Sequence, residues 1–516
     1  IRSLEFSPEF GFKLNGKKIF LQGNANHHDL GALGATCYDK AIERMMLQLK
    51  SFGYNCIRCS HNPYSDSFAR IADRVGILVV DELTDKWSDN DYWGGRQPFT
   101  HIWHKLITEW IKRDRNRPSI ILWSLGNELQ IREGWAGFEG TNDWGITTYN
   151  IFNQLVKRWD HTRLTTVAMF PARAGAITRH DKEFNDYLVP PELACATEVA
   201  SFNYQSDKYD AYLKYRPDLI LFQSEAETSN LLQPYYNMDK ERMVGIAYWG
   251  SVEYWGESNK WPKKGWNYSF FEHTMRPYPQ AYLIKTAFMP EIPEVHIGVV
   301  DAAGAESVSW NDVIVGRMAL NECWNHTPGS RRSLFTFTNA HSVELLVNGQ
   351  SMGIQKNDTT RANLRNMIYW KDVPYGNGGS VVAIARDKSG KEVARHRIET
   401  AGKAVALRIE AETPTDWKAD GMDLQYINVT VIDKKGRPVW DYNEPLTLQM
   451  EGAARLVALD NGDHYTDELF HGITSKRMYQ GRMQIILRSD QEAGNVTVKI
   501  SSAGLKGTLR LKTIKE

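Results

Sequence analysis

The sequence has few cysteines, five in 516 residues, and they are scattered along the chain. This excludes the disulfide framework that stabilises many small secreted domains. There is also no apolar run close to the ~18 residues that a membrane helix needs. The 62 basic and 62 acidic side chains cancel, so the chain lacks the positive excess that a nucleic-acid or anionic-membrane partner requires. We therefore expect no nucleic-acid partner and no membrane partner.

Hydrophobic residues make up 42% of the chain, which is typical of a globular protein. At roughly 150 residues per domain, the length predicts about three domains. Tryptophan is abundant: 12 of the 17 fall between Trp87 and Trp266. A large core is one interpretation of this concentration. Sugar binding is the other, because an indole face packs well against the apolar face of a pyranose.

The chain begins at Ile1 without a methionine, and no charged segment followed by an apolar run is present. It therefore carries no readable signal peptide. We interpret the start as a cut inside a longer protein, so the cellular location cannot be assigned from it.

The first 290 residues alternate short β-rich runs with amphipathic helical stretches. Three helices are expected at 39–52, at 66–75 between Ser65 and Gly76, and at 100–114. Eight strand–helix units in about 280 residues predict a (β/α)8 barrel. An open nucleotide-binding sheet is disfavoured because no Gly-x-Gly-x-x-Gly follows the first strand. The expected strands are 19–26, 55–60, 77–82, 119–126, 164–170, 199–205, 219–225 and 243–250.

After about residue 291 the helical periodicity fades, and short alternating runs bounded by Gly, Asn, Asp and Pro take its place. The pairs Asn348-Gly349 and Asn461-Gly462 predict hairpin turns. We interpret this part as two Ig-like β-sandwich domains. The predicted domains are a catalytic barrel at 1–290, a β-sandwich at 291–403 and a second β-sandwich at 404–516.

Functional residues of such barrels lie at the carboxyl ends of the strands. Glu128 and Glu225 each follow an apolar run and are expected to face the barrel mouth. Two carboxyl groups that share one cavity suffice for glycoside hydrolysis, one as proton donor and the other as nucleophile or base. Mutual repulsion keeps one protonated, while a cation such as Arg58 keeps the other ionised. Alternatively, each glutamate is a helix cap or a salt-bridge partner.

Several segments resemble glycoside hydrolase family 2, the family of β-galactosidases, β-glucuronidases and β-mannosidases. The resemblance extends in order along the whole predicted barrel, and VELLVNGQSMG at 343–353 resembles the sandwich that follows it in β-galactosidase-like members. It implies that a sugar-binding jelly roll and a first Ig-like domain would precede this chain. The segments are LNGKKIFLQGNANHHD, NCIRCSHNPYSDSFARIADRVGILVVDE, RDRNRPSIILWSLGNE and LFQSEAET.

The resemblance implies roles for individual positions. Glu128 matches the general acid/base and Glu225 the nucleophile, with Glu227 as the competing candidate two residues on. Asn127 matches the residue that hydrogen-bonds the sugar 2-hydroxyl, and Tyr204 matches the tyrosine that hydrogen-bonds the nucleophile. The remaining matches are residues of the sugar site, namely His27, Arg58, His61 and Trp249.

The chain departs from the family at two places. Lys86 and Ser88 stand where metal-dependent members carry magnesium ligands, so we expect no catalytic metal and no cofactor. The Asn-x-Lys motif by which β-glucuronidases hold a carboxylate is absent from its expected place. Lys260, Lys263 and Lys264 keep a glucuronidase possible, although a solvated loop is the simpler interpretation. A metal-dependent hydrolase is disfavoured, because adjacent His27 and His28 point to opposite faces of a strand.

These observations predict a retaining exo-β-glycosidase that hydrolyses terminal β-D-galactosides, with a β-glucuronidase or another β-glycosidase as the alternative. A catalytically inactive carbohydrate-binding protein is the alternative of another class. The expected partner is an oligosaccharide or glycoside, and the oligomeric state stays open. A polysaccharide-degrading role slightly favours a periplasmic or secreted protein. Retention requires the carboxyl groups of Glu128 and Glu225 to lie ~5–5.5 Å apart.

Overall fold

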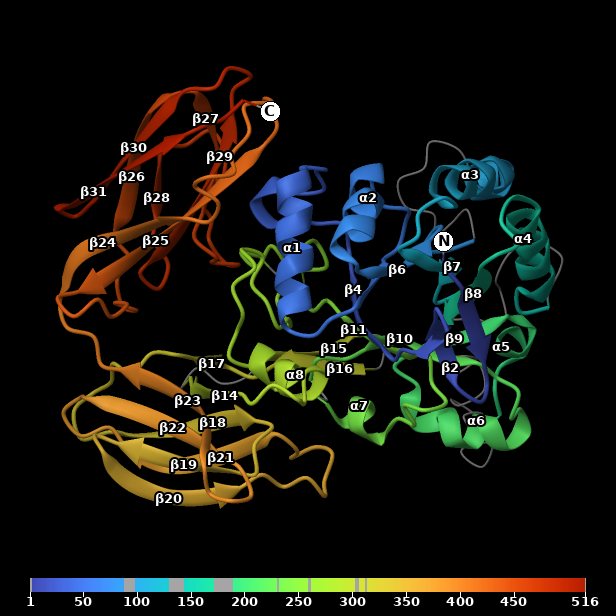
Figure 1. Ribbon diagram of the computed structural model, residues 1–516, viewed down its shortest axis with the longest axis horizontal. Coiled ribbons are helices and arrows are strands. Elements are labelled where there is room, and N and C mark those ends of the chain that lie inside the picture. The colour runs from blue at the N-terminus through green and yellow to red at the C-terminus, as the bar shows by residue number, and fades with distance from the viewer. Residues whose placement is uncertain are drawn as a thin grey trace. The chain divides into compact units, whose positions relative to one another are not determined.

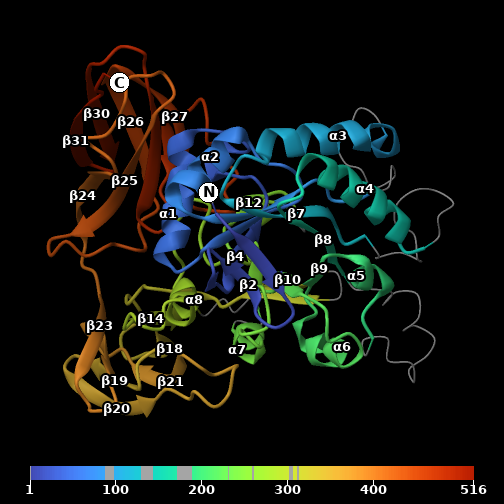
Figure 2. The ribbon, with the colours of Figure 1, turned by 45° about the vertical axis from the view of Figure 1, so that its right-hand side comes forward.

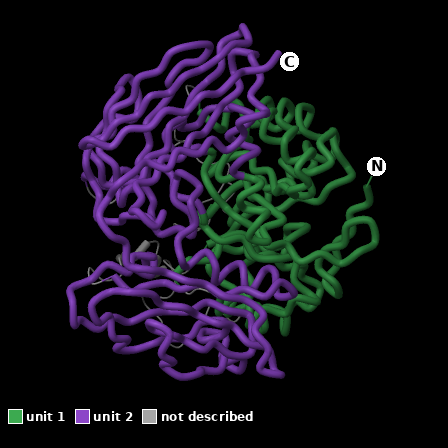
Figure 3. Tube along the Cα trace, turned by 60° about the vertical axis from the view of Figure 1, so that its left-hand side comes forward, with its two compact units in different colours: residues 1–28, 46–251, 308–315 green, residues 29–45, 252–307, 316–516 purple. Residues whose placement is uncertain are grey.

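The computed structural model describes residues 2–87, 98–129, 143–170, 189–229, 232–258, 261–301, 306–310 and 313–515. The chain divides into two compact units, which Figure 3 shows in different colours. Unit 1 comprises residues 1–28, 46–251 and 308–315, and unit 2 comprises residues 29–45, 252–307 and 316–516.

Unit 1 contains a closed barrel of eight parallel strands in the order β10-β11-β4-β5-β6-β7-β8-β9. The predicted (β/α)8 barrel is thereby confirmed, and each strand lies within two residues of its expected bounds. The strands are β4 (Leu21–Asn26), β5 (Cys56–Cys59), β6 (Leu78–Glu82), β7 (Ile120–Asn127), β8 (Leu164–Met169), β9 (Val199–Asn203), β10 (Leu221–Ala226) and β11 (Gly245–Trp249).

The barrel strands are buried on both faces, which is why they read as continuous apolar runs in the sequence. In β7 all eight residues are buried. Helices α3 to α6 lie on the outer side of strands β7 to β10 (Figures 1 and 2). The helices are α1 (Asp39–Ser51), α2 (Asp66–Val75), α3 (Phe99–Asp114), α4 (Ile146–Trp159), α5 (Glu192–Ala196), α6 (Tyr209–Tyr215), α7 (Gln233–Asn237) and α8 (Ala281–Phe288).

Helix α2 shows how local sequence sets the ends of an element. The Ser65 side chain accepts a hydrogen bond from the backbone N–H of Phe68, as an N-cap residue does. At the other end Gly76 adopts a left-handed conformation with φ of 77°, which favours glycine. The predicted start and end of this helix are both confirmed.

Short strands flank the barrel strands in sequence. A three-stranded sheet is formed near the N-terminus by β1 (Leu4–Ser7), β2 (Gly11–Leu14) and β3 (Lys17–Lys18). Two strand pairs follow the barrel, β12 (Tyr254–Trp255) with β13 (Gly265–Trp266) and β15 (Glu306–Trp310) with β16 (Val313–Arg317).

Between residues 295 and 399, unit 2 has two four-stranded antiparallel sheets around one apolar core. Asn348 and Gly349 join β19 to β20 with positive φ at both positions, so the first predicted hairpin turn is confirmed. One sheet has β17 (Leu320–Asn321), β14 (Val295–Val300), β18 (Arg331–Thr338) and β21 (Met367–Pro374); the other has β20 (Gln350–Lys356), β19 (Ser342–Val347), β22 (Ser380–Arg386) and β23 (Glu392–Glu399).

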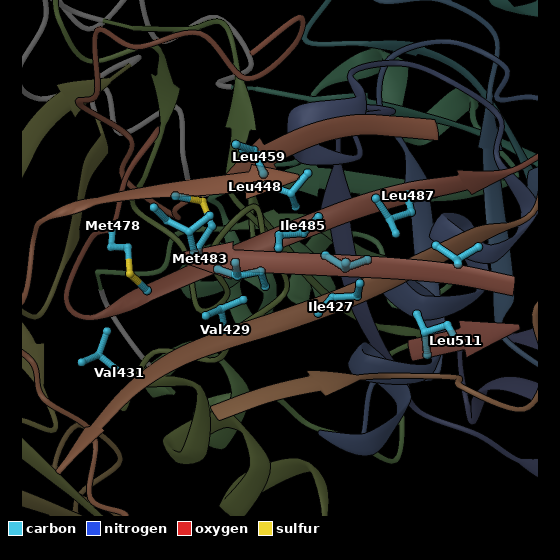
Figure 4. Packing of buried hydrophobic residues seen from close by; sticks show 14 of the residues in the cluster. Ile427, Val429, Val431, Leu448, Leu459, Met478, Met483, Ile485, Leu487 and Leu511 are labelled. Atoms are coloured by element: carbon cyan, nitrogen blue, oxygen red, sulfur yellow. The ribbon is translucent and has the colours of Figure 1, made fainter. Parts of the chain in front are cut away.

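Residues 404–512 form two further four-stranded sheets. Their inward side chains make the core drawn in Figure 4, where Ile427, Val429 and Ile485 lie between the strands. Alternation of buried and exposed residues along β30 and β31 is typical of sheets with one solvated face. One sheet has β24 (Ala404–Ala411), β25 (Leu424–Asp433), β29 (Arg482–Ser489) and β27 (Ala454–Asp460); the other has β28 (Ser475–Arg477), β26 (Pro445–Gly452), β30 (Asn495–Ser502) and β31 (Leu505–Lys512).

The second predicted hairpin turn, at Asn461-Gly462, is wrong. Strand β27 pairs with β29, whereas the next strand, β28, pairs with β26 in the other sheet. The chain therefore crosses between sheets through a long loop at 461–474, and only Gly462 of the pair has a positive φ. Among the described residues, no helix combines the length and apolar character needed to cross a membrane.

Candidate active site

Arg58, on β5, is the centre of a buried polar network at the carboxyl ends of the barrel strands. Its Nη1 donates a hydrogen bond to Glu225 Oε1 at 2.6 Å, and its Nη2 donates to Asn127 Oδ1 at 2.9 Å. Nε and Nη2 both donate to Glu82, at 3.1 and 2.7 Å to Oε2. A guanidinium suits this position because its planar fork of donors serves several carboxyl and amide oxygens at once.

Glu82, the last residue of β6, is fully buried at 0% exposure. Besides Arg58, it accepts a hydrogen bond from Ser124 Oγ at 2.6 Å and lies 2.6 Å from His61 Nδ1. Burial alone raises the pKa of Glu82, but the Arg58 charge and the His61 contact outweigh it and lower the pKa below its usual value. Glu82 therefore stays ionised and shares the positive charge of Arg58 with Glu225.

Glu225, on β10, is held from two sides. Tyr204 donates a hydrogen bond from Oη to Glu225 Oε2 at 2.7 Å, while Arg58 holds Oε1. His61 Nε2 lies 3.9 Å from Oε1. The carboxylate is thus fixed in orientation beside a permanent positive charge.

Glu128 follows β7 and is also buried. Asn203 on β9 donates a hydrogen bond from Nδ2 to Glu128 Oε1 at 3.1 Å. Burial raises the pKa of Glu128 to about 8, and the negative charge of Glu225 adds to the rise. Lys86 and the Asn203 hydrogen bond act in the opposite direction. At neutral pH this carboxyl group is therefore protonated and can donate a proton.

Three aromatic side chains lie next to each other beside this network. The rings of His61 and Trp249 stack with centroids 5.2 Å apart, and His27 meets Trp249 edge-on at 5.1 Å. His27 Nδ1 is 3.1 Å from the backbone oxygen of Ser60. His28 instead stacks on Tyr64, with ring centroids 4.7 Å apart, so the two adjacent histidines have different surroundings.

The sequence matches family models along most of this architecture. Residues 9–240 match the model of the glycosyl hydrolases family 2 TIM barrel domain, and residues 407–509 match the glycoside hydrolase family 2 C-terminal domain 5. The chain belongs to glycoside hydrolase family 2. Residues 329–394 match a domain of unknown function, DUF4982.

The relatives of this family 2 chain are named after two different activities. Beta-galactosidase BoGH2A of Bacteroides ovatus is 27% identical over 98% of this chain and 62% of its own length. A putative beta-glucuronidase of Formosa agariphila is 44% identical over 99% of this chain and 50% of its own length. The chain thus spans between half and two thirds of the length of these two curated relatives.

A solved structure of a glycosyl hydrolase family 2 member from Bacteroides cellulosilyticus superposes with a TM-score of 0.87. It is 28% identical, and the match covers 100% of this chain and 65% of that chain.

All eight residues proposed for the family 2 site lie at the carboxyl ends of barrel strands or in the residues that follow them. Direct contacts join most of them into one network, and Glu128 is connected to it through Asn203, which also donates to Asn127 Oδ1 at 3.0 Å. Their catalytic and sugar-binding roles stay predictions. The eight are His27, Arg58, His61, Asn127, Glu128, Tyr204, Glu225 and Trp249.

Sequence reasoning missed four members of the network: Glu82, Asp85, Lys86 and Asn203. Lys86 Nζ donates to the backbone oxygen of Asn127 at 3.0 Å and to Asp85 Oδ1 at 2.6 Å. Glu82 and Asn203 were visible as polar residues at strand ends, but nothing in the sequence separates them from helix caps. Ser88, the other position considered for a metal ligand, lies outside the described residues.

The lysine-rich stretch after the barrel differs from the expectation of a solvated loop. Lys263 is only 4% exposed, and its Nζ lies 4.0 Å from the ring centroid of Tyr268. Lys264 Nζ lies 5.0 Å from the ring centroid of Trp261. The expectation is wrong for Lys263, because its ammonium group faces the ring of Tyr268 and the residue is buried. Lys260 lies outside the described residues.

Proposed function

We propose that this chain carries the catalytic site of a retaining exo-β-glycosidase that acts on terminal, non-reducing β-D-galactosides. The observation that supports it is the contrast between the surroundings of two buried carboxyl groups. Burial raises the pKa of Glu128 to about 8, whereas Glu225 is ion-paired with Arg58 at 2.6 Å. A proton donor and an anionic nucleophile are the two groups that retaining hydrolysis needs.

In the first step, a Glu225 oxygen attacks the anomeric carbon, and Glu128 transfers its proton to the glycosidic oxygen as the bond to the aglycone breaks. The product is a glycosyl ester of Glu225, and Glu128 is left as a carboxylate. In the second step, Glu128 takes a proton from water, and the oxygen of that water displaces Glu225 from the anomeric carbon. Glu128 regains its proton, so the cycle closes.

The surrounding residues position these groups. Arg58 and Tyr204 hold both oxygens of Glu225, so little reorientation precedes attack. Asn127, placed by Arg58 and Asn203, is expected to hydrogen-bond the sugar 2-hydroxyl, a contact that strengthens in the transition state. His27, His61 and Trp249 are expected to contact the terminal sugar.

A β-glucuronidase is the second candidate, because the putative beta-glucuronidase of Formosa agariphila is 44% identical to this chain. A glucuronide carries a carboxylate that a galactoside lacks, and a lysine in the sugar site would bind it. The galactoside is preferred because the Asn-x-Lys motif is absent from its expected place.

The deciding experiment is hydrolysis of a panel of nitrophenyl β-glycosides, including the galactoside, glucuronide, mannoside and glucoside. Because the relatives are longer than this chain, the assay uses the chain itself and the full product of its gene. Fastest release from the galactoside supports the proposal, and fastest release from the glucuronide replaces it with the second candidate. Binding of sugars without release from any member of the panel would indicate a carbohydrate-binding protein instead.

A further inference from the structure

Three buried side chains of unit 2 bring metal-binding atoms together, and none of them belongs to the barrel site. Glu253 precedes β12, His273 follows β13, and His464 lies in the loop after β27. One ligand atom from each lies within 4.8 Å of the other two. All three residues are at most 4% exposed, so the cluster is shielded from bulk solvent.

The distances within the cluster fit one shared ion. Glu253 Oε2 lies 3.0 Å from His273 Nδ1 and 3.3 Å from His464 Nδ1. In a tetrahedral zinc site with bonds of about 2.0–2.1 Å, neighbouring ligand atoms lie about 3.3 Å apart. The two measured separations are close to that value.

The far sides of two ligands are fixed by hydrogen bonds, as is usual for ligands of a metal. His273 Nε2 lies 2.9 Å from Asp460 Oδ1, which orients the imidazole so that Nδ1 faces Glu253. Glu253 Oε1 accepts a hydrogen bond from Tyr278 Oη at 2.6 Å, while Oε2 accepts one from the backbone N–H of His273 at 3.2 Å and faces both imidazoles. A carboxylate behind a histidine also makes that histidine a stronger ligand.

A fourth position is available to water. Glu253 and His464 line a cavity of about 220 Å³ within unit 2, which is large enough for several water molecules. Within the described part of the chain, His464 Nε2 has no hydrogen-bond partner, although His464 is only 4% exposed. With Nδ1 on the ion, Nε2 of His464 carries the proton, and a water molecule in this cavity would accept its hydrogen bond.

A second cluster, formed by His296, Glu322 and His396, has a similar composition but unsuitable geometry. His396 Nδ1 accepts a hydrogen bond from the backbone N–H of Ile297 at 3.0 Å, so its Nε2 carries the proton and has no lone pair for a metal. The rings of His296 and His396 stack with centroids 4.0 Å apart. This cluster therefore supplies a matched control.

We propose that Glu253, His273 and His464 bind one zinc ion, with water as the fourth ligand. Two imidazoles and one carboxylate favour zinc over magnesium or calcium, which prefer oxygen ligands. The ion connects the segment 253–273 to the loop 461–474, both within unit 2 in Figure 3. The competing occupant is a proton, with His273 as an imidazolium between Glu253 and Asp460.

The test measures zinc in the purified chain by elemental mass spectrometry, after incubation with zinc and removal of the loosely bound fraction. The wild type and the control His396→Ala are expected to retain about one zinc per chain, and His464→Ala to bind it at least ~10-fold more weakly. Cobalt added in place of zinc should give visible absorption bands in the first two proteins and not in the third. Thermal unfolding should shift upward with zinc in the same two proteins only.

The proposal is overturned if the wild type holds no zinc after this treatment, or if the wild type and His464→Ala hold equal amounts. Either result favours a protonated His273 between Glu253 and Asp460. A zinc loss in His396→Ala as large as in His464→Ala also overturns the proposal. Asp460→Asn serves if His464→Ala does not fold. Its amide keeps the shape but weakens the support behind His273, so zinc affinity is expected to fall ~10–100-fold; unchanged affinity would contradict the site.

Discussion

Arg58 Nη1 lies 2.6 Å from Glu225 Oε1, and both side chains are buried at the mouth of the barrel. The two residues stand 167 positions apart in the sequence, on strands β5 and β10. The Nε and Nη2 atoms of the same guanidinium donate hydrogen bonds to Glu82. Glu82 is therefore the structural partner of Arg58, whereas Glu225 is the carboxylate that we propose as the nucleophile. One buried cation is therefore shared by two carboxylates.

Replacement of Arg58 by methionine leaves Glu82 and Glu225 buried without their cation. Removal of one partner from a buried pair typically costs about 3–5 kcal/mol, so we expect a loss of stability of that order. Arg455→Met removes an exposed ion pair with Asp490 and should cost less than about 1 kcal/mol. Urea unfolding of both variants measures the difference, and equal losses would contradict the central place of Arg58.

Glu225→Gln should keep the fold and sugar binding but lower kcat by roughly 10⁴-fold or more, since an amide is a poor nucleophile. Glu227→Gln is the matched control, two residues further on, and should retain most of the activity. The measurement is the turnover of the best nitrophenyl glycoside, with binding of a competitive inhibitor as the check on folding. A larger loss of kcat in Glu227→Gln than in Glu225→Gln would identify Glu227 as the nucleophile instead.

The pKa of Glu128, raised to about 8, sets the upper limit of the pH range. A general acid must carry its proton, so kcat/KM should fall as the pH rises, with a midpoint near pH 8. In Glu128→Gln this limb should disappear. The same variant should lose roughly 10²–10⁴-fold on substrates with a poor leaving group and little on dinitrophenyl glycosides, which leave without a proton. An alkaline limb that survives in the variant would assign the acid elsewhere.

Lys86 stabilises the ionised form of Glu128, so its charge lowers the pKa of that carboxyl group. Lys86→Met should therefore raise the pKa of Glu128 and move the alkaline limb of kcat/KM to higher pH. Lys208→Met removes an exposed charge next to Asp207 and should leave the limb in place. A shift to lower pH in Lys86→Met would show that this lysine acts on Glu128 in another way.

The barrel and its strand ends could be predicted because strands buried on both faces produce continuous apolar runs, and polar residues after such runs are conspicuous. Glu128 and Glu225 were found in this way. The pairing of Arg58 with Glu82 could not be predicted, because it depends on the direction of side chains across the closed barrel. A single sequence gives no information on which strand-end carboxylate Arg58 would reach.

The two wrong expectations have a common physical cause. Asn461-Gly462 has the composition of a hairpin turn, but the partner strands are chosen by sheet packing, which places β28 in the other sheet. The stretch around Lys263 has the composition of a solvated loop, but the Lys263 ammonium group faces the ring of Tyr268. In both cases tertiary contacts override a correct local preference.

The last prediction concerns stability, because Glu128 and Glu82 have pKa values shifted in opposite directions. The unfolded chain ionises Glu128 near its ordinary value of 4.5, whereas the folded chain keeps it protonated to about pH 8. Stability is therefore lost as the pH rises between these values, and the full penalty is present above about pH 8. Glu128→Gln, which cannot ionise, should raise the unfolding temperature at pH 8 and change it little at pH 4.

Glu82→Gln should do the opposite. Its folded pKa is lowered, so its contribution to stability is present above the ordinary pKa of a glutamate and is lost as the pH falls through the lowered value. At pH 8 the variant should unfold at a lower temperature than the wild type, because Arg58 loses one of its two buried ionic partners, and the difference should shrink in acid. Calorimetry from pH 4 to pH 9 measures the unfolding temperature of both variants. If the unfolding temperatures of both variants shift in the same direction at pH 8, the assignment of one protonated and one ionised carboxyl group is contradicted.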